Sequence, residues 1–309
     1  MKRLNRYELS LFAVLAYYVA LCYNMTMKTV SNNLFTGERA LFKQTDLNVT
    51  DCIFADGESP LKECCNITVN NCDFKWKYPL WYGKNVCVAD SRFAETARAG
   101  IWYTDGIKIS RSVIDSPKNF RRSSHINLTD ITFTNAAETL WNCTDIRLAR
   151  VTAGGGSYFA KNCADVIADG LDLVGDYAFD GAQNVTVSNS KMITKDAFWN
   201  SQNVTVRNSY ISGEYFGWNS RNLTLVDCTV DSLQGFCYIQ NLTLVNCRLA
   251  NTDRAFEYCT VHADVVGHIQ SIVNPLSGRI VADSIGKITL DDSGIDRSQT
   301  EIVCRKQGD

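Results

Sequence analysis

The 309-residue chain carries 31 basic and 33 acidic side chains, and its formal net charge is −2 at pH 7. This balance leaves no basic excess to meet a phosphate backbone, so nucleic acid is not an expected partner. An ordinary hydrophobic content of 45% and only 4 prolines argue for a folded chain rather than a disordered one. The length suits one large domain or two ordinary ones.

The beginning of the chain has the features of a secretion signal. The basic stretch MKRLNR precedes an apolar run from Leu9 to Cys22, which is short for a bilayer span and suits the core of a signal peptide. The alternative is a misassigned start, because Met25 and Met27 lie directly downstream. We expect residues 1–33 to lie outside the folded domain, no membrane span within that domain, and a cytoplasmic protein. A genuine signal peptide would mean export instead.

One nine-residue phrase recurs along the chain and determines the expected fold. It starts most often with Asn or Asp (position 0), has apolar residues at positions +1 and +3, and has a small or medium-sized residue at +6. Each copy alternates apolar and polar residues, as a strand with one buried face does. The eleven copies follow one another at intervals of 19 to 21 residues and begin at Asp46, Asn66, Asn85, Gly106, His125, Asp145, Asp165, Asn184, Asn203, Asn222 and Asn241.

A repeat of this length that holds short strands and no helical stripe is typical of one coil of a parallel β-helix. Leucine-rich repeats have a similar length, but they need a leucine and asparagine frame and a helical return, and neither occurs here. We predict an all-β fold, a single-stranded right-handed parallel β-helix of about 11–13 coils over residues 34–292, with a polar tail at 293–309. Like positions of successive coils should then stack in columns.

Two such columns account for much of the cysteine content. At positions +6 and −2, Cys exchanges with Ser and with small apolar residues, which indicates buried stacks of reduced thiols. The alternative is disulfides between coils, since the pairs Cys52/Cys72, Cys143/Cys163 and Cys228/Cys247 would lie one coil apart. The sequence has no Cys-x-x-Cys pair and no histidine cluster, so we expect no metal and no cofactor.

Asparagine at position 0 has a local physical reason. Its side chain tolerates left-handed turns, and stacked amides can bond to each other along the rod. The many Asn-x-Thr triplets, such as that at Asn203, follow from this repeated pattern, so we do not interpret them as glycosylation sites.

Position −4 carries an unusual row of large and charged residues, which are Trp81, Trp102, Arg121, Trp141, Lys161, Asp180, Trp199 and Trp218. Charged side chains are costly in an unpaired core, so we predict that this row faces outward and that strict alternation turns positions −5 and −3 inward. Exposed tryptophans in a row usually mark a binding surface, and flat indoles beside polar groups suit the sugar rings of a polymer. The candidate substrate-binding residues are Trp81, Trp102, Arg121, Trp141, Trp199 and Trp218. A covered or inward-facing row is the alternative.

Carboxylates accompany this row. Asp180, Asp196 and Glu214 fall on three successive coils, where separations of about 5 to 10 Å would cover both geometries of glycosidases. A lyase would need a base, for which Lys161 beside Asp180 is a candidate. We therefore name Asp180, Asp196, Glu214 and Lys161 as candidate catalytic residues. Acids that only satisfy turns are the alternative, so the question of enzymatic activity stays open.

Several segments, among them NNLFTGERALF, FKWKYPLWY, ARAGIWYTD, NAAETLWNC and SGEYFGWNS, resemble a bacterial domain-of-unknown-function family. That family is built as a single-stranded right-handed β-helix of the pectin-lyase-like type, and its members usually begin close to the FTGERALF segment. The resemblance covers roughly residues 33–292, and it implies the fold but no activity, cofactor or catalytic residue.

From the row of residues at position −4 we expect a protein that interacts with a polysaccharide or oligosaccharide, with lyase or hydrolase activity left open. The alternative is a non-catalytic scaffold or assembly module whose aromatic face meets protein, including a homo-oligomer formed through that face.

Overall fold

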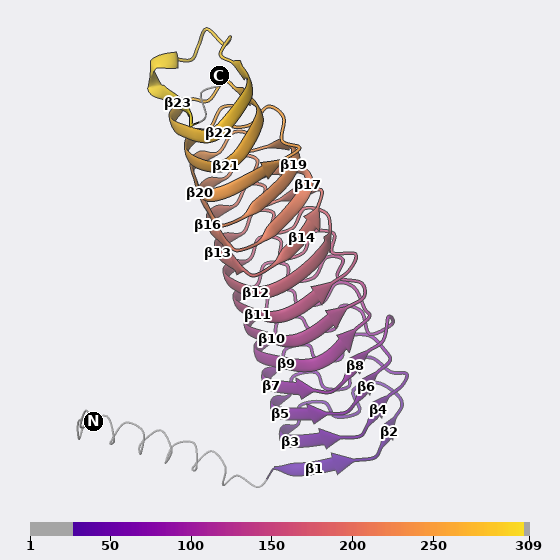
Figure 1. The fold of residues 1–309 in the computed structure, drawn as a ribbon. Coiled ribbons are helices and arrows are strands. Elements are labelled where there is room, and N and C mark those ends of the chain that lie inside the picture. Colours follow the sequence, from indigo (N-terminus) through magenta and orange to yellow (C-terminus); the bar gives the residue numbers. More distant parts are fainter. Residues whose placement is uncertain (1–26, 306–309) are drawn as a thin grey trace, which may run out of the picture.

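The computed structural model describes residues 27–305 and shows a parallel β-solenoid of about 15 turns (Figure 1). Its strands stack along a rod from β1 (Lys28–Ser31) at one end to β23 (Thr300–Cys304) at the other. Among the described residues the only helical segment is the short 3-10 turn η1 (Arg297–Gln299). The predicted all-β parallel β-helix is confirmed. It has more turns than the repeated phrase indicated, because segments without the phrase also form coils.

Six coils contain a six-residue strand and then a second strand of two to seven residues. The six-residue strands are β3 (Thr45–Thr50), β5 (Cys65–Asn70), β7 (Lys84–Ala89), β13 (Gln183–Ser188), β16 (Gln202–Arg207) and β18 (Arg221–Val226). The second strands are β2 (Leu34–Phe35), β4 (Ile53–Phe54), β6 (Asp73–Phe74), β8 (Arg92–Phe93), β14 (Lys191–Thr194), β15 (Asp196–Ala197), β17 (Tyr210–Phe216) and β19 (Thr229–Gly235).

In seven further coils the two strands run together into one. These long strands are β9 (Asp105–Ile114), β10 (Ser124–Phe133), β11 (Thr144–Ala153), β12 (Ala164–Gly175), β20 (Gln240–Ala250), β21 (Thr260–Val273) and β22 (Ser277–Thr289).

Successive coils stack in register. Val185 pairs with Val204 of the next coil, and Val204 pairs with Leu223 of the coil after it. Equivalent positions of the phrase therefore lie one above another, as predicted. The register shifts between β20 and β21 and again between β21 and β22, in the region where the sequence departs from the repeated phrase.

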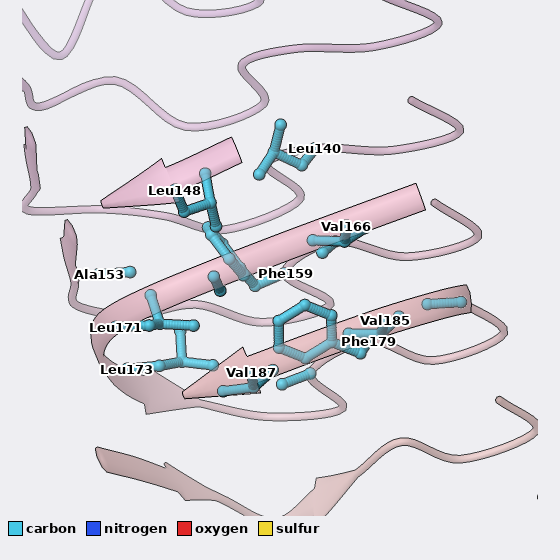
Figure 2. Packing of buried hydrophobic residues seen from close by; sticks show 14 of the residues in the cluster. Leu140, Leu148, Ala153, Phe159, Val166, Leu171, Leu173, Phe179, Val185 and Val187 are labelled. Carbon is cyan, nitrogen blue, oxygen red and sulfur yellow. The ribbon is translucent and has the colours of Figure 1, made fainter. Parts of the chain in front are cut away.

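The apolar positions of the phrase point into the rod and form one continuous core. Figure 2 shows Val166 and Val185 in this core together with Phe159 and Phe179. Phenylalanines of successive coils also stack on one another, with ring centroids 4.9 Å apart for Phe54 and Phe74 and 4.7 Å apart for Phe74 and Phe93. Each coil exposes apolar faces above and below, so only its neighbours can complete its core.

The residue at position 0 turns the chain at a corner of each coil. Asn184, Asn203 and Asn222 have φ of 55°, 56° and 56° there, a conformation that Asn tolerates better than most residues. The Asn203 amide donates to the Asn184 side-chain oxygen at 2.9 Å, and the Asn222 amide donates to Asn203 at 2.8 Å. The predicted bonding of stacked amides along the rod is confirmed.

A second ladder lies at position +5, where the chain turns again with positive φ. The Asn208 amide donates to Asn189 at 2.7 Å, and in other coils Arg150 forms a paired hydrogen bond with Asp130. The sequence pattern did not predict this column, because its residue type varies more than that of position 0.

The cysteines of the two predicted columns are buried free thiols. Cys143 and Cys163 each donate to a backbone carbonyl of the preceding coil, at 3.1 Å and 2.9 Å. Burial raises the pKa of the Cys72 thiol to about 11, so this thiol is not reactive at neutral pH. These thiols serve as small core residues.

The solenoid extends beyond the expected limits of 34–292 at both ends. β1 pairs with β3, and β23, within the segment expected as a polar tail, pairs with β22. The expected signal-like segment falls almost entirely outside the described residues. Within residues 27–305, no helix is long and apolar enough to cross a membrane.

The ladder at position 0 generates a stability prediction. Asn203→Gly keeps the positive φ accessible but loses both side-chain hydrogen bonds, whereas Asn203→Ala also places a Cβ in a left-handed conformation. We expect losses of about 2 kcal/mol for the Gly variant and about 1 kcal/mol more for the Ala variant, measured by denaturant unfolding. Gln202→Ala, at the exposed neighbouring position, should change little. Equal stability of the Gly and Ala variants would rule out this account of the corner.

Candidate functional site

The row at position −4 faces outward. We call its residues from Trp81 to Trp218 the aromatic stripe; Trp81, Trp102, Trp141, Trp199 and Trp218 are all half-buried at the surface, while their neighbours at −5 are buried. The predicted facing of position −4 agrees with the structure. The inward facing of position −3 was wrong: Tyr82 and Tyr238 are 44% and 45% exposed. Residues at −3 have positive φ, which breaks the alternation that a regular strand would impose.

The first half of the stripe is closely stacked on itself. The indoles of Trp81 and Trp102 lie 5.1 Å apart and 8° from parallel. The Arg121 guanidinium lies between the rings of Trp102 and Trp141, 4.6 Å and 4.7 Å from their centroids. The three indole N–H groups donate to backbone carbonyls of neighbouring coils. Here the flat faces of the rings contact other side chains of the protein, and the ring edges meet solvent.

A flanking column at position −7 runs beside the stripe. Its members are Tyr78, Ala99, Lys118, Glu138, Tyr158, Tyr177, Asp196, Tyr215 and Gln234. Its rings contact the stripe directly: Tyr177 lies 5.9 Å from Trp199, and Tyr215 lies 5.3 Å from Trp218. Asp196 was predicted from the sequence as a candidate site residue, but this column was not. The same repeat frame contains the signal, three residues before each stripe position.

Asp196 lies in the flanking column between Tyr177 and Tyr215. Asp196 is the first residue of β15, which lies just before the stripe residue Trp199 in the chain. It pairs with Tyr215 of β17, and its neighbour Ala197 forms a bridge with Ala178. The charges that act on Asp196 include Asp180 of the stripe column and Glu214 beside Tyr215. We call the group Tyr177, Asp196, Trp199, Tyr215 and Trp218 the corner site.

The Asp196 carboxylate is buried without a partner. The residue is 1% exposed, and neither carboxylate oxygen has a hydrogen-bond partner. Burial, then the nearby charges of Asp180 and Glu214, raise the pKa of Asp196 from its ordinary value of 3.8 to about 7, against the opposing effect of Lys195. Buried polar groups are nearly always satisfied, and a strongly perturbed carboxyl group is characteristic of functional sites.

The other candidate catalytic residues lie around the corner site and have partners. Lys161 Nζ lies 2.7 Å from Asp180 and 4.3 Å from the centroid of the Tyr158 ring. Lys195 Nζ lies 3.6 Å from Glu214, which is more exposed than Asp180. The structure therefore groups all four predicted residues on neighbouring coils, with Asp196 as the one acid that lacks a cation of its own.

A shallow hollow opens next to the corner site. Its volume is about 420 Å³, and Thr194 and Lys195, which directly precede Asp196, line it with Val174 and Ile193. Gly213 also lines the hollow, and a Cβ at this position would collide with the backbone carbonyl of Thr194, so the close approach of the two coils here requires glycine. A ligand in this hollow would contact Lys195, the residue directly before Asp196.

The arrangement has defined chemical capacities. A carboxyl group whose pKa lies near 7 holds a proton part of the time at neutral pH, which suits a general acid. Ionised carboxylates nearby can accept hydrogen bonds or stabilise positive charge. Within residues 27–305, no group of three or more His, Cys, Asp or Glu side chains is placed to hold a metal ion.

The pKa of Asp196 generates a prediction about stability. Between about pH 4 and pH 7 the folded protein keeps a proton that the unfolded chain has lost, so this group makes stability fall as pH rises. A rise in pKa from 3.8 to about 7 corresponds to about 4 kcal/mol lost above pH 7. Asp196→Asn carries no charge and should gain stability relative to wild type across this window, measured by thermal unfolding. A stability difference that is independent of pH would contradict the burial of a titrating Asp196.

Solved structures similar to this chain are β-helix proteins. The Azotobacter vinelandii mannuronan C-5 epimerase AlgE4 A-module is 11% identical, with 92% of this chain and 91% of that chain covered and a TM-score of 0.36. A mutant tailspike protein of E. coli bacteriophage HK620, in complex with a hexasaccharide, is 9% identical, with 91% and 73% covered and a TM-score of 0.45. The surface adhesin PfbA of Streptococcus pneumoniae is 11% identical, with 86% and 74% covered and a TM-score of 0.27. Likenesses this weak say nothing about activity.

No curated protein matches the sequence significantly. A family model described as "Protein of unknown function (DUF3737)" matches residues 28–303, nearly the whole solenoid. This match confirms the resemblance to a domain-of-unknown-function family, and it implies no catalytic residue. The chain belongs to the DUF3737 family.

Proposed function

We propose that this protein binds an oligosaccharide or a polysaccharide along the aromatic stripe, with the corner site as the centre of recognition. One observation carries the proposal: Asp196 is a buried carboxylate without a hydrogen-bond partner, and the residues one coil away in its column, Tyr177 and Tyr215, pack against Trp199 and Trp218 of the outward-facing stripe. Sugars combine hydroxyl donors with apolar ring faces. A carboxylate acceptor flanked by aromatic rings offers the complementary set of groups.

The packing of the corner site differs from that of the first half of the stripe. Trp199 and Trp218 lie 6.1 Å apart and 31° from parallel, whereas Trp81 and Trp102 lie 5.1 Å apart and 8° from parallel. The looser stack supports a role for Trp199 and Trp218 as the rings that a ligand displaces to reach Asp196. Trp81, Trp102, Arg121 and Trp141 would extend the surface along the rod and present mainly their edges to a long polymer.

The same geometry supports a candidate catalytic role. In a hydrolase, Asp196 would donate the proton to the leaving oxygen, and Glu214 or Asp180 would act as the ionised partner. In a lyase, Lys161 would be the candidate base, although its ion pair with Asp180 would first have to open. Screening for new reducing ends and for unsaturated products distinguishes both reactions from binding alone.

Binding can be tested with stripe variants. Trp199→Ala together with Trp218→Ala removes both rings of the corner site, so affinity for any oligosaccharide that wild type binds should fall at least about tenfold. The measurement is titration calorimetry against a panel of neutral, acidic and amino-sugar oligosaccharides. Trp76→Ala is the matched control, because Trp76 is exposed and lies outside the stripe. Wild-type affinity in the double variant would remove the corner site from the proposal.

Assembly through the aromatic face is the second candidate function. It is favoured by the exposure of Tyr82 and Tyr238, whose rings stack on Tyr103 and Tyr258 and form two separate aromatic pairs at the surface. A stable dimer in sedimentation experiments that dissociates on Tyr82→Ser and Tyr238→Ser substitution, without binding of any glycan, would favour assembly over saccharide binding.

A further inference from the structure

Charge is unevenly balanced around the corner site. The charges of Asp180 and Glu214 act on Asp196, and each of these two acids has a cationic partner. Lys161 pairs with Asp180 at 2.7 Å, and Lys195 pairs with Glu214 at 3.6 Å. Within the described part of the chain no lysine or arginine forms an ion pair with Asp196. The most deeply buried of the three acids is therefore the one without a cation, and its ionised form carries an uncompensated negative charge.

Other coils show how this surface combines rings and acids. Arg121 lies between the rings of Trp102 and Trp141, and its guanidinium also lies 3.2 Å from Glu138. Lys161 lies over the Tyr158 ring and pairs with Asp180. In each place a cation contacts an aromatic face and a carboxylate together, which is a favourable arrangement for a positive charge.

The corner site has the aromatic rings and the carboxylate of this arrangement, while its cation is missing from the chain itself. Tyr177, Trp199, Tyr215 and Trp218 supply the rings, and Asp196 supplies the carboxylate. An uncharged sugar hydroxyl would satisfy the hydrogen bond and leave the charge uncompensated. A positively charged group would satisfy both.

We propose that the group received by the corner site is a protonated amine, and hence that the ligand is a glycan that contains free amino sugars. This inference rests on the proposed saccharide-binding function and narrows its substrate class. Polymers of uronic acids would bring further carboxylates towards Asp180, Asp196 and Glu214, so they should bind weakly at this site.

Binding of an ammonium group also has a consequence for protons. A cation beside Asp196 favours its ionised form, so binding near neutral pH should release a proton from a carboxyl group that otherwise holds it part of the time. A neutral sugar that donates only a hydrogen bond would release much less. Calorimetric titration in buffers with different ionisation enthalpies measures the number of protons released.

The test compares glucosamine oligomers, N-acetylglucosamine oligomers and galacturonate oligomers of matched length, at a pH where the amines are protonated. We expect the glucosamine oligomers to bind at least about tenfold more tightly than the acetylated ones, with release of protons. Asp196→Asn should reduce their affinity to that of the acetylated oligomers and abolish the release. Asp172→Asn is the matched control, because Asp172 is an exposed aspartate of β12 outside the corner site. Thermal unfolding of both variants checks that they are folded.

The outcomes separate the two proposals. Equal affinity for free and acetylated oligomers would overturn the amine inference and leave saccharide binding standing. A simple diamine that binds as tightly as the amino-sugar oligomer would show that the sugar rings contribute nothing, which would overturn the glycan assignment. Absence of binding by every oligosaccharide in the panel would overturn both proposals.

Discussion

Parallel pairing of successive coils in register is the constraint on which the rest of this molecule depends. Each strand bonds to the strand one coil earlier, so throughout the region of the repeated phrase each residue lies directly above its equivalent in the preceding coil. A column of equivalent positions then shares one environment along the rod, whether core, corner or surface. Stacked phenylalanines in the core, asparagine ladders at the corners and the aromatic stripe outside are three results of this one alignment.

The same alignment explains why the stripe is mainly a structural feature over its first half. Coils are close enough for large flat rings of adjacent coils to contact face to face. Trp81 and Trp102 therefore stack on each other, and Arg121 packs between two indoles. A row of tryptophans on a solenoid is therefore weaker evidence of an open binding surface than the same row on a flat sheet. The unusual feature is Asp196, whose buried carboxylate finds no hydrogen-bond partner among the neighbouring coils.

Asp196 is unfavourable for the fold alone, since ionisation of a buried and unpartnered carboxyl group costs free energy. Tyr177 and Tyr215 occupy the equivalent places one coil below and one coil above, where the rings pack against the stripe. An aromatic residue at position 196 would continue that column without this cost. The chain thus places a buried acid where the coils directly below and above have a ring, which is the kind of local inconsistency expected at a functional site.

The sequence by itself determined the fold class, the columns and the outward face of the stripe, because a period of 19 to 21 residues and the alternation within each copy leave few other ways to bury the apolar positions. The Asn203 ladder and the small core thiols followed from the same frame. Tertiary structure alone decided that Tyr82 faces outward, that the rings of Trp81 and Trp102 cover each other, and that Asp196 is enclosed without a partner. These features depend on positive φ angles at the corners and on side-chain contacts between different columns. A repeat pattern specifies which residues stack along a column, but the turns of the backbone decide which columns meet.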